Sequence, residues 1–183
     1  MNIVERAKNM LIEPRAEWPR VAAEPMTAQQ IYTGWVMILA AIGPIAILIG
    51  WGVRLGFATS VSMAIANYAI ALAVTAILAL VIDALAPNFG GSKDFVAALK
   101  LSAFSYTPAF LAGVFHLLGH NGGILVLIAM VYAWYLFYLG VPVLNKARAD
   151  KAIVFTIVIV VIGFALGMLF GMLAARGLAP GLT

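Results

Sequence analysis

Five long apolar stretches, separated by short polar segments, run along this chain of 183 residues. Each reaches the ~20 residues that a helix needs to cross the hydrocarbon core of a membrane. They lie at about 31–51, 61–86, 100–118, 124–144 and 152–175. The runs are continuous and lack the two-residue alternation of membrane β-strands. They therefore predict an all-α polytopic membrane protein, with a bundle of five transmembrane helices in one domain at 31–176.

Residues 1–30 form a polar lead-in with no apolar core, so we do not interpret them as a cleavable signal. One face of a helix here would carry Ile3, Val4, Ala7, Met10 and Leu11. This amphipathic pattern predicts a short helix in the membrane interface that ends at Pro14. Trp18 is expected to anchor the segment at the interface. A solvated tail folded back on the bundle is the alternative.

The composition supports a membrane protein. Only 10% of the residues are charged, 64% are hydrophobic and the mean hydropathy is +1.07. A soluble domain carries about a quarter charged residues, so this chain could not build an aqueous surface. It has no cysteine, which excludes a disulfide scaffold, a thiolate metal site and a cysteine nucleophile.

The basic residues predict the orientation. With the N-terminus inside, nine of the eleven basic residues lie in cytoplasmic segments. These are Arg6, Lys8, Arg15, Arg20, Lys93, Lys100, Lys146, Arg148 and Lys151. Only Arg54 and Arg176 lie outside. The alternation follows the positive-inside bias, which predicts a cytoplasmic N-terminus and an external C-terminus.

The third span has two faces at helical spacing. One is small and polar: Ser102, Ser105, Ala109, Ala112, His116 and His120. The other is bulky and apolar: Leu101, Phe104, Pro108, Leu111, Phe115 and Leu118. We expect the small face to turn toward other helices and the bulky face toward lipid.

Proline interrupts two spans. Gly43-Pro44 lies at the centre of the first and predicts a kink there. Pro108 leaves the carbonyl of Phe104 without its helical partner, and nearby hydroxyls can satisfy such freed groups. Alternatively, the kink lines a polar cavity for a solute or a lipid headgroup. The candidate cavity residues are Ser102, Ser105, Tyr106, Thr107, Pro108, Asn67 and Asp83, with Thr75 able to face the same interior.

Three ionisable residues are candidates for chemistry in the membrane. Asp83 is the only acidic residue inside a predicted span, near the same depth as Lys100. We interpret the two as a structural ion pair, with a proton or ion site as the alternative. His116 and His120 have the i, i+4 spacing of a metal-binding pair, but two ligands are too few for a metal site. They are interpreted as hydrogen-bonded interfacial residues, with an external metal or pH-sensing pair as the alternative. No metal or cofactor is predicted.

Gly163, Gly167 and Gly171 repeat at every fourth position of the last span. Such a ridge lets a neighbouring helix approach closely. The neighbour is either in the same chain or in a second copy, which would make a homodimer.

Ser105-Tyr106-Thr107-Pro108 and the run from Tyr135 to Pro142, Tyr-Leu-Phe-Tyr-Leu-Gly-Val-Pro, resemble the Ypt-interacting-protein (YIP) family. Glu17-Trp18-Pro19 and Tyr32-Thr33-Gly34 support the resemblance, which covers essentially the whole chain. It implies a small bacterial inner-membrane member with five spans and a cytoplasmic N-terminal segment. Eukaryotic relatives act in vesicle trafficking with Rab-type GTPases. That role does not carry over, because bacteria lack such GTPases in that form. The longer N-terminal region of the eukaryotic relatives, which is missing here, weakens GTPase binding further.

No nucleophile, base and orienting group occur together, and Gly90-Gly91-Ser92-Lys93 lacks the spacing of a phosphate loop. The short basic loops are explained by topology, so no nucleic-acid partner is expected. We therefore predict a non-enzymatic membrane protein that binds or organises lipid or another membrane protein. The alternative is a small transporter or channel for an ion, solute or lipid near Pro108, favoured by the two broken helices.

Overall fold

The computed structural model describes residues 2–178, without the side chains of residues 53–55, 119–121, 175, 177 and 178. This part of the chain folds into helices and contains no strand. Two short helices come first, α1 (Ile3–Ile12) and α2 (Pro14–Ala23). The elements of the bundle follow: α3 (Ala28–Ile31), η1 (Tyr32–Val36), α4 (Met37–Ala40), α5 (Ile42–Leu55), α6 (Phe57–Leu85), η2 (Ala86–Phe89), α7 (Phe95–Ser105), α8 (Thr107–Ala112), η3 (Gly113–Gly122), α9 (Gly123–Leu144), η4 (Ala149–Lys151) and α10 (Ala152–Leu178).

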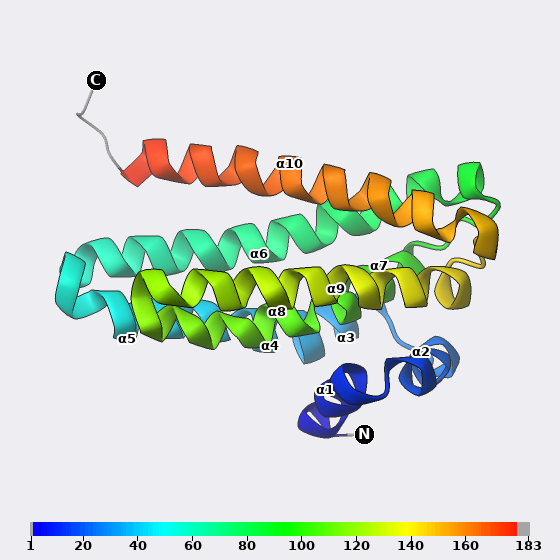
Figure 1. Ribbon diagram of the computed structural model, residues 1–183, viewed down its shortest axis with the longest axis horizontal. Coiled ribbons are helices and arrows are strands. Elements are labelled where there is room, and N and C mark those ends of the chain that lie inside the picture. Colours follow the sequence, from blue (N-terminus) through cyan, green and yellow to red (C-terminus); the bar gives the residue numbers. More distant parts are fainter. Residues whose placement is uncertain (1, 179–183) are drawn as a thin grey trace.

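Within the described residues, five helical segments are long and apolar enough to cross a membrane, so the predicted number of spans is confirmed. They are Ala28–Gly52, Phe57–Phe89, Phe95–Leu118, Gly123–Leu144 and Ala149–Ala174. Figure 1 shows them running back and forth along the long axis, with α1 and α2 against one side of the bundle. We call the end that carries η2, η4 and the segment 145–148 the basic end, because Lys146, Arg148 and Lys151 lie there.

Both helix breaks occur where proline predicts them. The first span is interrupted at Ala41, three residues before Pro44. The third is interrupted at Tyr106, which ends α7 and precedes Pro108 in the first turn of α8. The two broken helices approach closely, because a Cβ atom on Gly113 would lie 2.7 Å from the Cα atom of Gly43. Only glycine fits at this contact.

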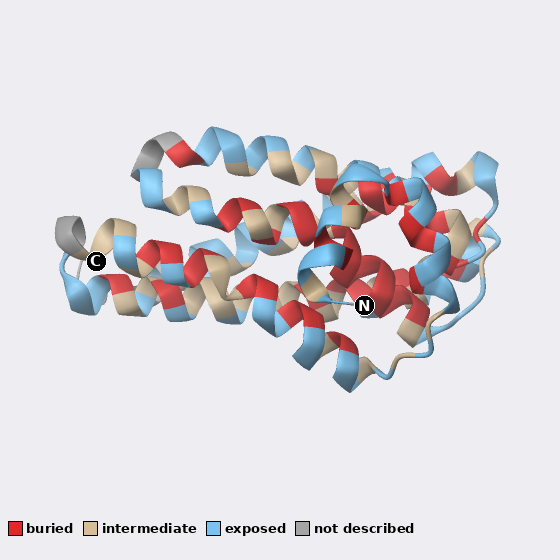
Figure 2. Ribbon diagram, turned by 90° about the horizontal axis from the view of Figure 1, so that it is seen from below, coloured by how far each residue is buried: buried red, intermediate tan, exposed pale blue. Residues whose placement is uncertain are grey.

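Helix α7 lies at the centre of the packed part of the molecule, where every residue from Ala97 to Ser105 is buried. The expectation that the bulky face of the third span meets lipid is wrong for this half, because Leu101 and Phe104 are buried in the core. It holds only further along, where Leu118 is exposed. Figure 2 shows the buried residues gathered in the half of the bundle nearer the basic end. There α7 packs between α6 and α9, and the N-terminal segment contacts its remaining side through α2, α3 and Arg6.

The N-terminal helices are part of the core rather than a solvated tail. Helix α1 buries Ala7 and Met10 and exposes Val4 and Ile12, as an interfacial amphipathic helix would. It ends at Ile12, and Pro14 begins a second helix instead of a loop. Proline suits that first position because its missing N–H would be unpaired there in any case.

Trp18 is not an interfacial anchor. Its side chain is fully buried, and its indole nitrogen donates a hydrogen bond to the carbonyl of Leu136 on α9, at 3.1 Å. Gly140 makes room for the ring, because a Cβ atom there would lie 2.8 Å from it. A glycine on one span thus receives the tryptophan of the lead-in.

A charged cluster joins α1 to α2. Arg6 is 8% exposed and forms ion pairs with Glu24 and with Glu17, whose side chain is fully buried. Arg20 lies 3.2 Å from the same Glu17 carboxylate. Removing one partner of a buried pair leaves an uncompensated charge, so this cluster ties the two helices together.

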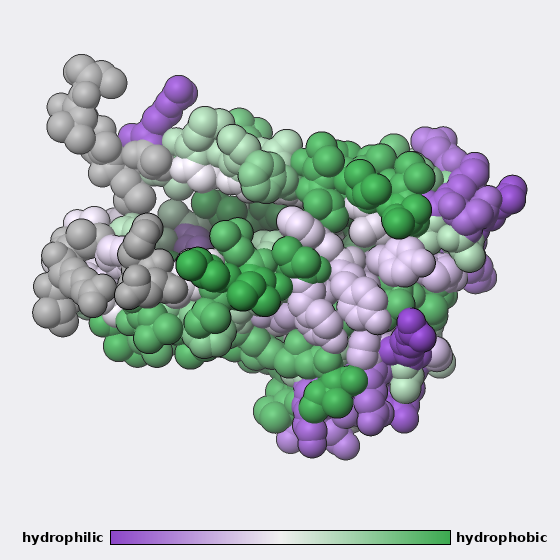
Figure 3. Space-filling view, viewed as in Figure 1, coloured by the Kyte–Doolittle hydropathy of each residue, from purple (hydrophilic) through white to green (hydrophobic). Residues whose placement is uncertain are grey.

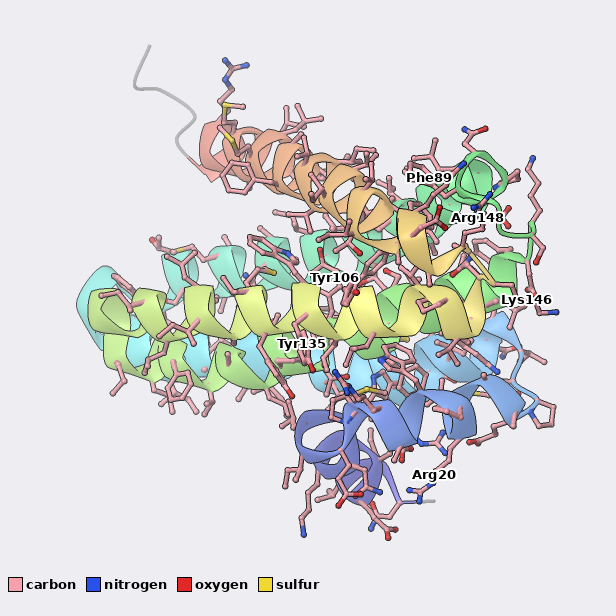
Figure 4. All side chains as sticks on the ribbon, turned by 45° about the vertical axis from the view of Figure 1, so that its right-hand side comes forward. Arg20, Phe89, Tyr106, Tyr135, Lys146 and Arg148 are labelled. Carbon is pink, nitrogen blue, oxygen red and sulfur yellow. The ribbon has the colours of Figure 1, made fainter. Side chains whose placement is uncertain are left out.

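At the basic end, two connections interlock. The amide of Ser92 donates to the carbonyl of Asn145 at 3.1 Å, and the amide of Arg148 donates to the carbonyl of Phe89 at 3.2 Å. Figure 4 shows Phe89, Lys146 and Arg148 at this same end. Asp94 caps α7, because its side chain accepts a hydrogen bond from the amide of Ala97.

Large apolar side chains are exposed along every span, as a lipid-facing surface requires, and α10 is the least covered. Figure 3 shows hydrophobic side chains over most of the bundle, with hydrophilic ones at the basic end and on the N-terminal helices. This distribution agrees with a membrane that surrounds the bundle and leaves the basic end outside the hydrocarbon.

The orientation is testable because the chain has no cysteine, so an introduced one is unique. Ala58, at the start of α6, and Asn88, in η2, are both exposed and lie on opposite sides of the second span. With a cytoplasmic N-terminus, Ala58→Cys should react with a membrane-impermeant maleimide in spheroplasts. Asn88→Cys should react only after permeabilisation. The reverse labelling pattern would show that the charge bias was misinterpreted.

Candidate functional site

The interior of the bundle holds a cavity of about 230 Å³ among α5, α6, α8, η3, α9 and α10. Its polar lining comes from Asn67 and Thr75 on α6, Tyr106 at the break of the third span and His116 on η3. The rest is apolar or small, including Gly43, Gly113, Gly163 and Gly167. Figure 4 shows Tyr106 in the middle of the bundle, close to α9. The cavity therefore lies well inside the part of the molecule that the membrane surrounds.

Glycines make this space. A Cβ atom on Gly43 would lie 3.3 Å from the amide oxygen of Asn67, and one on Gly163 would lie 3.3 Å from the hydroxyl oxygen of Tyr106. By contrast, a Cβ atom on Gly167 would have no described atom within 4 Å. Gly167 thus borders open space, whereas Gly43 and Gly163 allow polar groups to approach helix backbones.

The cavity lies directly behind a groove between α9 and α10. Tyr106, Met130, Gly163 and Gly167 line both spaces. The groove has a volume of about 280 Å³, and Trp134, Phe164 and Met168 form its outer part. Figure 3 shows the surface hollowed below α10. Phe164 and Met168 are exposed on the apolar surface of the spans, which faces lipid, so the groove opens toward lipid.

Of the candidate cavity residues, the structure places Asn67 and Tyr106 on this cavity. The hydroxyl of Ser102 donates to the carbonyl of Thr75 on α6, at 3.0 Å. The hydroxyl of Thr107 donates to the carbonyl of Phe104 at 2.7 Å. This is the carbonyl that Pro108 deprives of its helical partner, so the threonine does the structural work expected of it.

Ser105 and Pro108 lie elsewhere. The hydroxyl of Ser105 is buried and has no hydrogen-bond partner among the described residues. Pro108 lines a groove on the lipid-facing side, with Leu11, Leu111 and Tyr132. The short motif from Ser105 to Pro108 therefore contributes to the cavity mainly through Tyr106.

The predicted ion pair between Asp83 and Lys100 is wrong. Lys100 is 5% exposed, and its ammonium group donates to the carbonyls of Val21 at 2.8 Å and Glu24 at 2.5 Å. One oxygen of Asp83 is buried without a partner in the described part of the chain, away from the cavity. The sequence placed both residues at one depth. In the structure, however, the ammonium group of Lys100 binds backbone carbonyls at the end of the N-terminal segment instead of the Asp83 carboxylate.

His116 lines the cavity, but the side chain of His120 lies outside the described residues, so the histidine pair cannot be placed. No group of three possible metal ligands occurs in the described part of the chain. In the glycine ridge, Gly163 and Gly167 border the cavity, and Gly171 is exposed with no described atom near a Cβ atom. Pairing of the ridge with a second copy stays a prediction.

Sequence reasoning missed two contributors. Gly113 brings the third span against Gly43 of the first, and Met130 on α9 lies between cavity and groove. The only signal was that Gly113 lies four residues after Ala109 of the small face, because an isolated methionine on an apolar span carries none.

The fold defines a polytopic, all-helical membrane protein. Residues 8–170 match the Yip1 domain family, so the chain belongs to that family. The match begins inside the lead-in, in agreement with the packing of α1 and α2 on the bundle. Among curated proteins, the chain is similar to the inner membrane protein YohC of Escherichia coli strain K12. It is 26% identical over 156 residues, covering 78% of this chain and 80% of the relative.

The YohC protein of the Escherichia coli O6:H1 strain matches equally well. No solved structure matches. Together with the five spans, the family and the relative identify a multi-pass protein of the bacterial inner membrane. Neither the family nor the relative is a known enzyme.

The hydroxyls near Pro108 should differ in their effect on stability. Thr107→Val keeps the side-chain shape but removes the hydrogen bond to Phe104, so it should lower the free energy of unfolding by about 1 kcal/mol. Ser105→Ala removes a buried hydroxyl without a described partner and should leave stability unchanged or slightly higher. Thermal unfolding in one detergent would compare them. A larger loss for Ser105→Ala would show that its hydroxyl has a partner.

Proposed function

We propose that this protein is a non-enzymatic membrane-embedded binding protein whose interior cavity takes the polar part of an amphipathic, lipid-like ligand. The observation that supports this most is the position of the cavity, which has a polar lining and lies behind a groove that opens toward lipid. A ligand could then enter sideways from the bilayer between α9 and α10, without crossing either end of the bundle.

The polar groups of the cavity are free to bind a ligand. No hydrogen bond joins the Asn67 amide, the Tyr106 hydroxyl or the His116 ring to another side chain or carbonyl within the described residues. A ligand that offers donors and acceptors to these three groups would supply the hydrogen bonds that they lack.

The size of the cavity favours part of a ligand rather than a whole one. Sites for drug-sized molecules have volumes of about 300–1,000 Å³. The cavity, at about 230 Å³, is smaller, and the adjoining groove adds about 280 Å³ of mainly apolar space. A compact polar group inside with an apolar chain in the groove fits this division. The lining also favours binding over catalysis, because no carboxylate lies beside His116 on the described cavity lining to orient it as a base.

Transport of a small solute or lipid is the second candidate. It is favoured because both helix breaks meet the cavity: Gly43 beside Pro44 and Tyr106 before Pro108 both line it. Discontinuous helices around a midplane site are a feature of many transporters.

Filling the cavity should test the binding proposal. Gly167→Leu would place a side chain in open space at the cavity mouth without a backbone clash. The matched control is Gly171→Leu, one turn further along α10, where a side chain also meets no described atom but does not line the cavity. In nanodiscs with a phosphatidylglycerol that carries a diazirine on its acyl chain, we expect crosslinks to Trp134 and Phe164. Crosslinking should fall about tenfold in Gly167→Leu and not in Gly171→Leu.

Asn67→Leu provides a second arm, because it keeps the branched shape of the side chain and removes the polar amide. It should also lower crosslinking at Trp134 and Phe164. Equal labelling of wild type, Gly167→Leu and Asn67→Leu would contradict the proposal. Scrambling of a fluorescent phospholipid by the reconstituted protein, lost in Asn67→Leu, would replace binding by transport.

A further inference from the structure

A second polar cavity, of about 370 Å³, lies where the N-terminal segment meets the start of the first span. Arg6 of α1, Glu24 after α2, Gln30 of α3, Trp35 of η1 and Phe104 of α7 contribute to its wall. It shares no residue with the interior cavity between α9 and α10, so a ligand could bind here whether or not the interior cavity binds one. It lies against α1, the amphipathic helix that the sequence pattern predicts at the membrane interface.

The cavity holds one group of each charge. The guanidinium of Arg6 is nine-tenths buried and pairs with one carboxylate oxygen of Glu24, whose side chain is 40% exposed. Glu24 can therefore accept a second donor through its other oxygen. A ligand with a positive and a negative group close together would complement this pair.

Trp35 adds an unused donor. Its side chain is 4% exposed and stacks on Phe104, with ring centroids 4.5 Å apart. The indole N–H is buried and has no hydrogen-bond partner among the described residues. A buried indole usually finds a partner, so an acceptor on a bound ligand would account for its position.

The wall at this point is a π-helical turn, Tyr32–Val36, in which the amide of Met37 donates to the carbonyl of Tyr32. Such turns are rare and often occur at functional sites. The turn carries Thr33, Gly34 and Trp35 to the cavity, and a Cβ atom on Gly34 would have no described atom within 4 Å. Gly34 thus leaves open space in the wall of the cavity.

An apolar groove of about 450 Å³ adjoins the cavity at Ile3. It follows α1 from Ile3 to Ile12, with Ile38, Leu39 and Ile42 of the first span on its other side and Lys8 on its rim. The ten residues of α1 extend about 15 Å, which is half the ~30 Å hydrocarbon core. The groove is therefore long enough for an acyl chain from one leaflet.

From these features we propose that the cavity and groove form a binding site for a zwitterionic ethanolamine phospholipid. The phosphate lies against Arg6 and the indole N–H of Trp35, and the ammonium group lies against the Glu24 carboxylate. One acyl chain lies in the groove between α1 and the first span. The bound lipid thereby fills the space between the N-terminal segment and the bundle.

Native mass spectrometry of the full-length protein in detergent tests the site with three probes: phosphatidylethanolamine, phosphatidylglycerol and soluble glycerophosphoethanolamine. Wild type should retain phosphatidylethanolamine about tenfold more tightly than phosphatidylglycerol. Gly34→Leu, which fills the cavity without a backbone clash, should weaken phosphatidylethanolamine binding about tenfold. Gly52→Leu on the same span is the matched control, because it too borders open space but lies off the cavity, and it should bind as wild type does.

A second variant separates recognition from folding. Glu24→Gln keeps the size of the side chain and its hydrogen bond with Arg6 but removes the negative charge, so phosphatidylglycerol should then bind at least as well as phosphatidylethanolamine. Equal binding of the two lipids to wild type would overturn the headgroup assignment. Displacement of the lipid by an equal concentration of glycerophosphoethanolamine would overturn the role of the groove. Unchanged binding by Gly34→Leu would overturn the site itself.

Discussion

The buried ammonium group of Lys100 is the constraint on which the rest of the packing depends. Helix α7 places it inside the molecule, where an unpaired charge is strongly destabilising. Its partners are the carbonyls of Val21 and Glu24, which lie in the last turn of α2 and just after it, where helix carbonyls lack intrahelical partners. The ammonium group thus gains acceptors, and the two carbonyls gain a donor. The N-terminal segment must therefore lie against α7, and Trp18, Arg6 and Glu17 become part of the core with it.

This docking makes the two halves of the bundle different. In the half nearer the basic end, α1 and α2 cover the third span and nearly every residue of α7 is buried. Beyond the break at Tyr106, α1 reaches only α8, and glycines and polar side chains line the space between the helices. The interior cavity lies in this looser half. Close packing and open space are thus separated by the proline break in a single span.

Both proposed sites follow from this arrangement. The interior cavity has polar groups without described partners and an opening toward lipid between α9 and α10. The cavity at the N-terminal segment exists because α1 leans on the first span without filling the space between them. In both places a cavity with polar groups adjoins an apolar groove. An amphipathic ligand has the same two parts, a polar group and an apolar chain. A protein with two such places suits binding of lipid better than catalysis.

The sequence by itself determined the helical class, the five spans, the breaks near Pro44 and Pro108 and the family. Each of these depends on local properties: hydropathy summed along about twenty residues, or a proline that removes a hydrogen bond within its own helix. Even the partner of the Phe104 carbonyl, Thr107, could be anticipated, because it lies three residues away. Of the proposed cavity, Asn67 and Tyr106 were named from the sequence.

The tertiary structure decided which groups meet. Lys100 binds carbonyls of the N-terminal segment instead of Asp83, and Trp18 enters the core against Gly140 instead of the membrane interface. Gly43 meets Gly113, and the π-helical turn opens a cavity at Gly34. Residues at one depth can lie on opposite sides of a bundle, and only the rotation and crossing of the helices selects their neighbours. Hydropathy gives depth along the membrane normal, whereas partner choice requires the positions within the membrane plane.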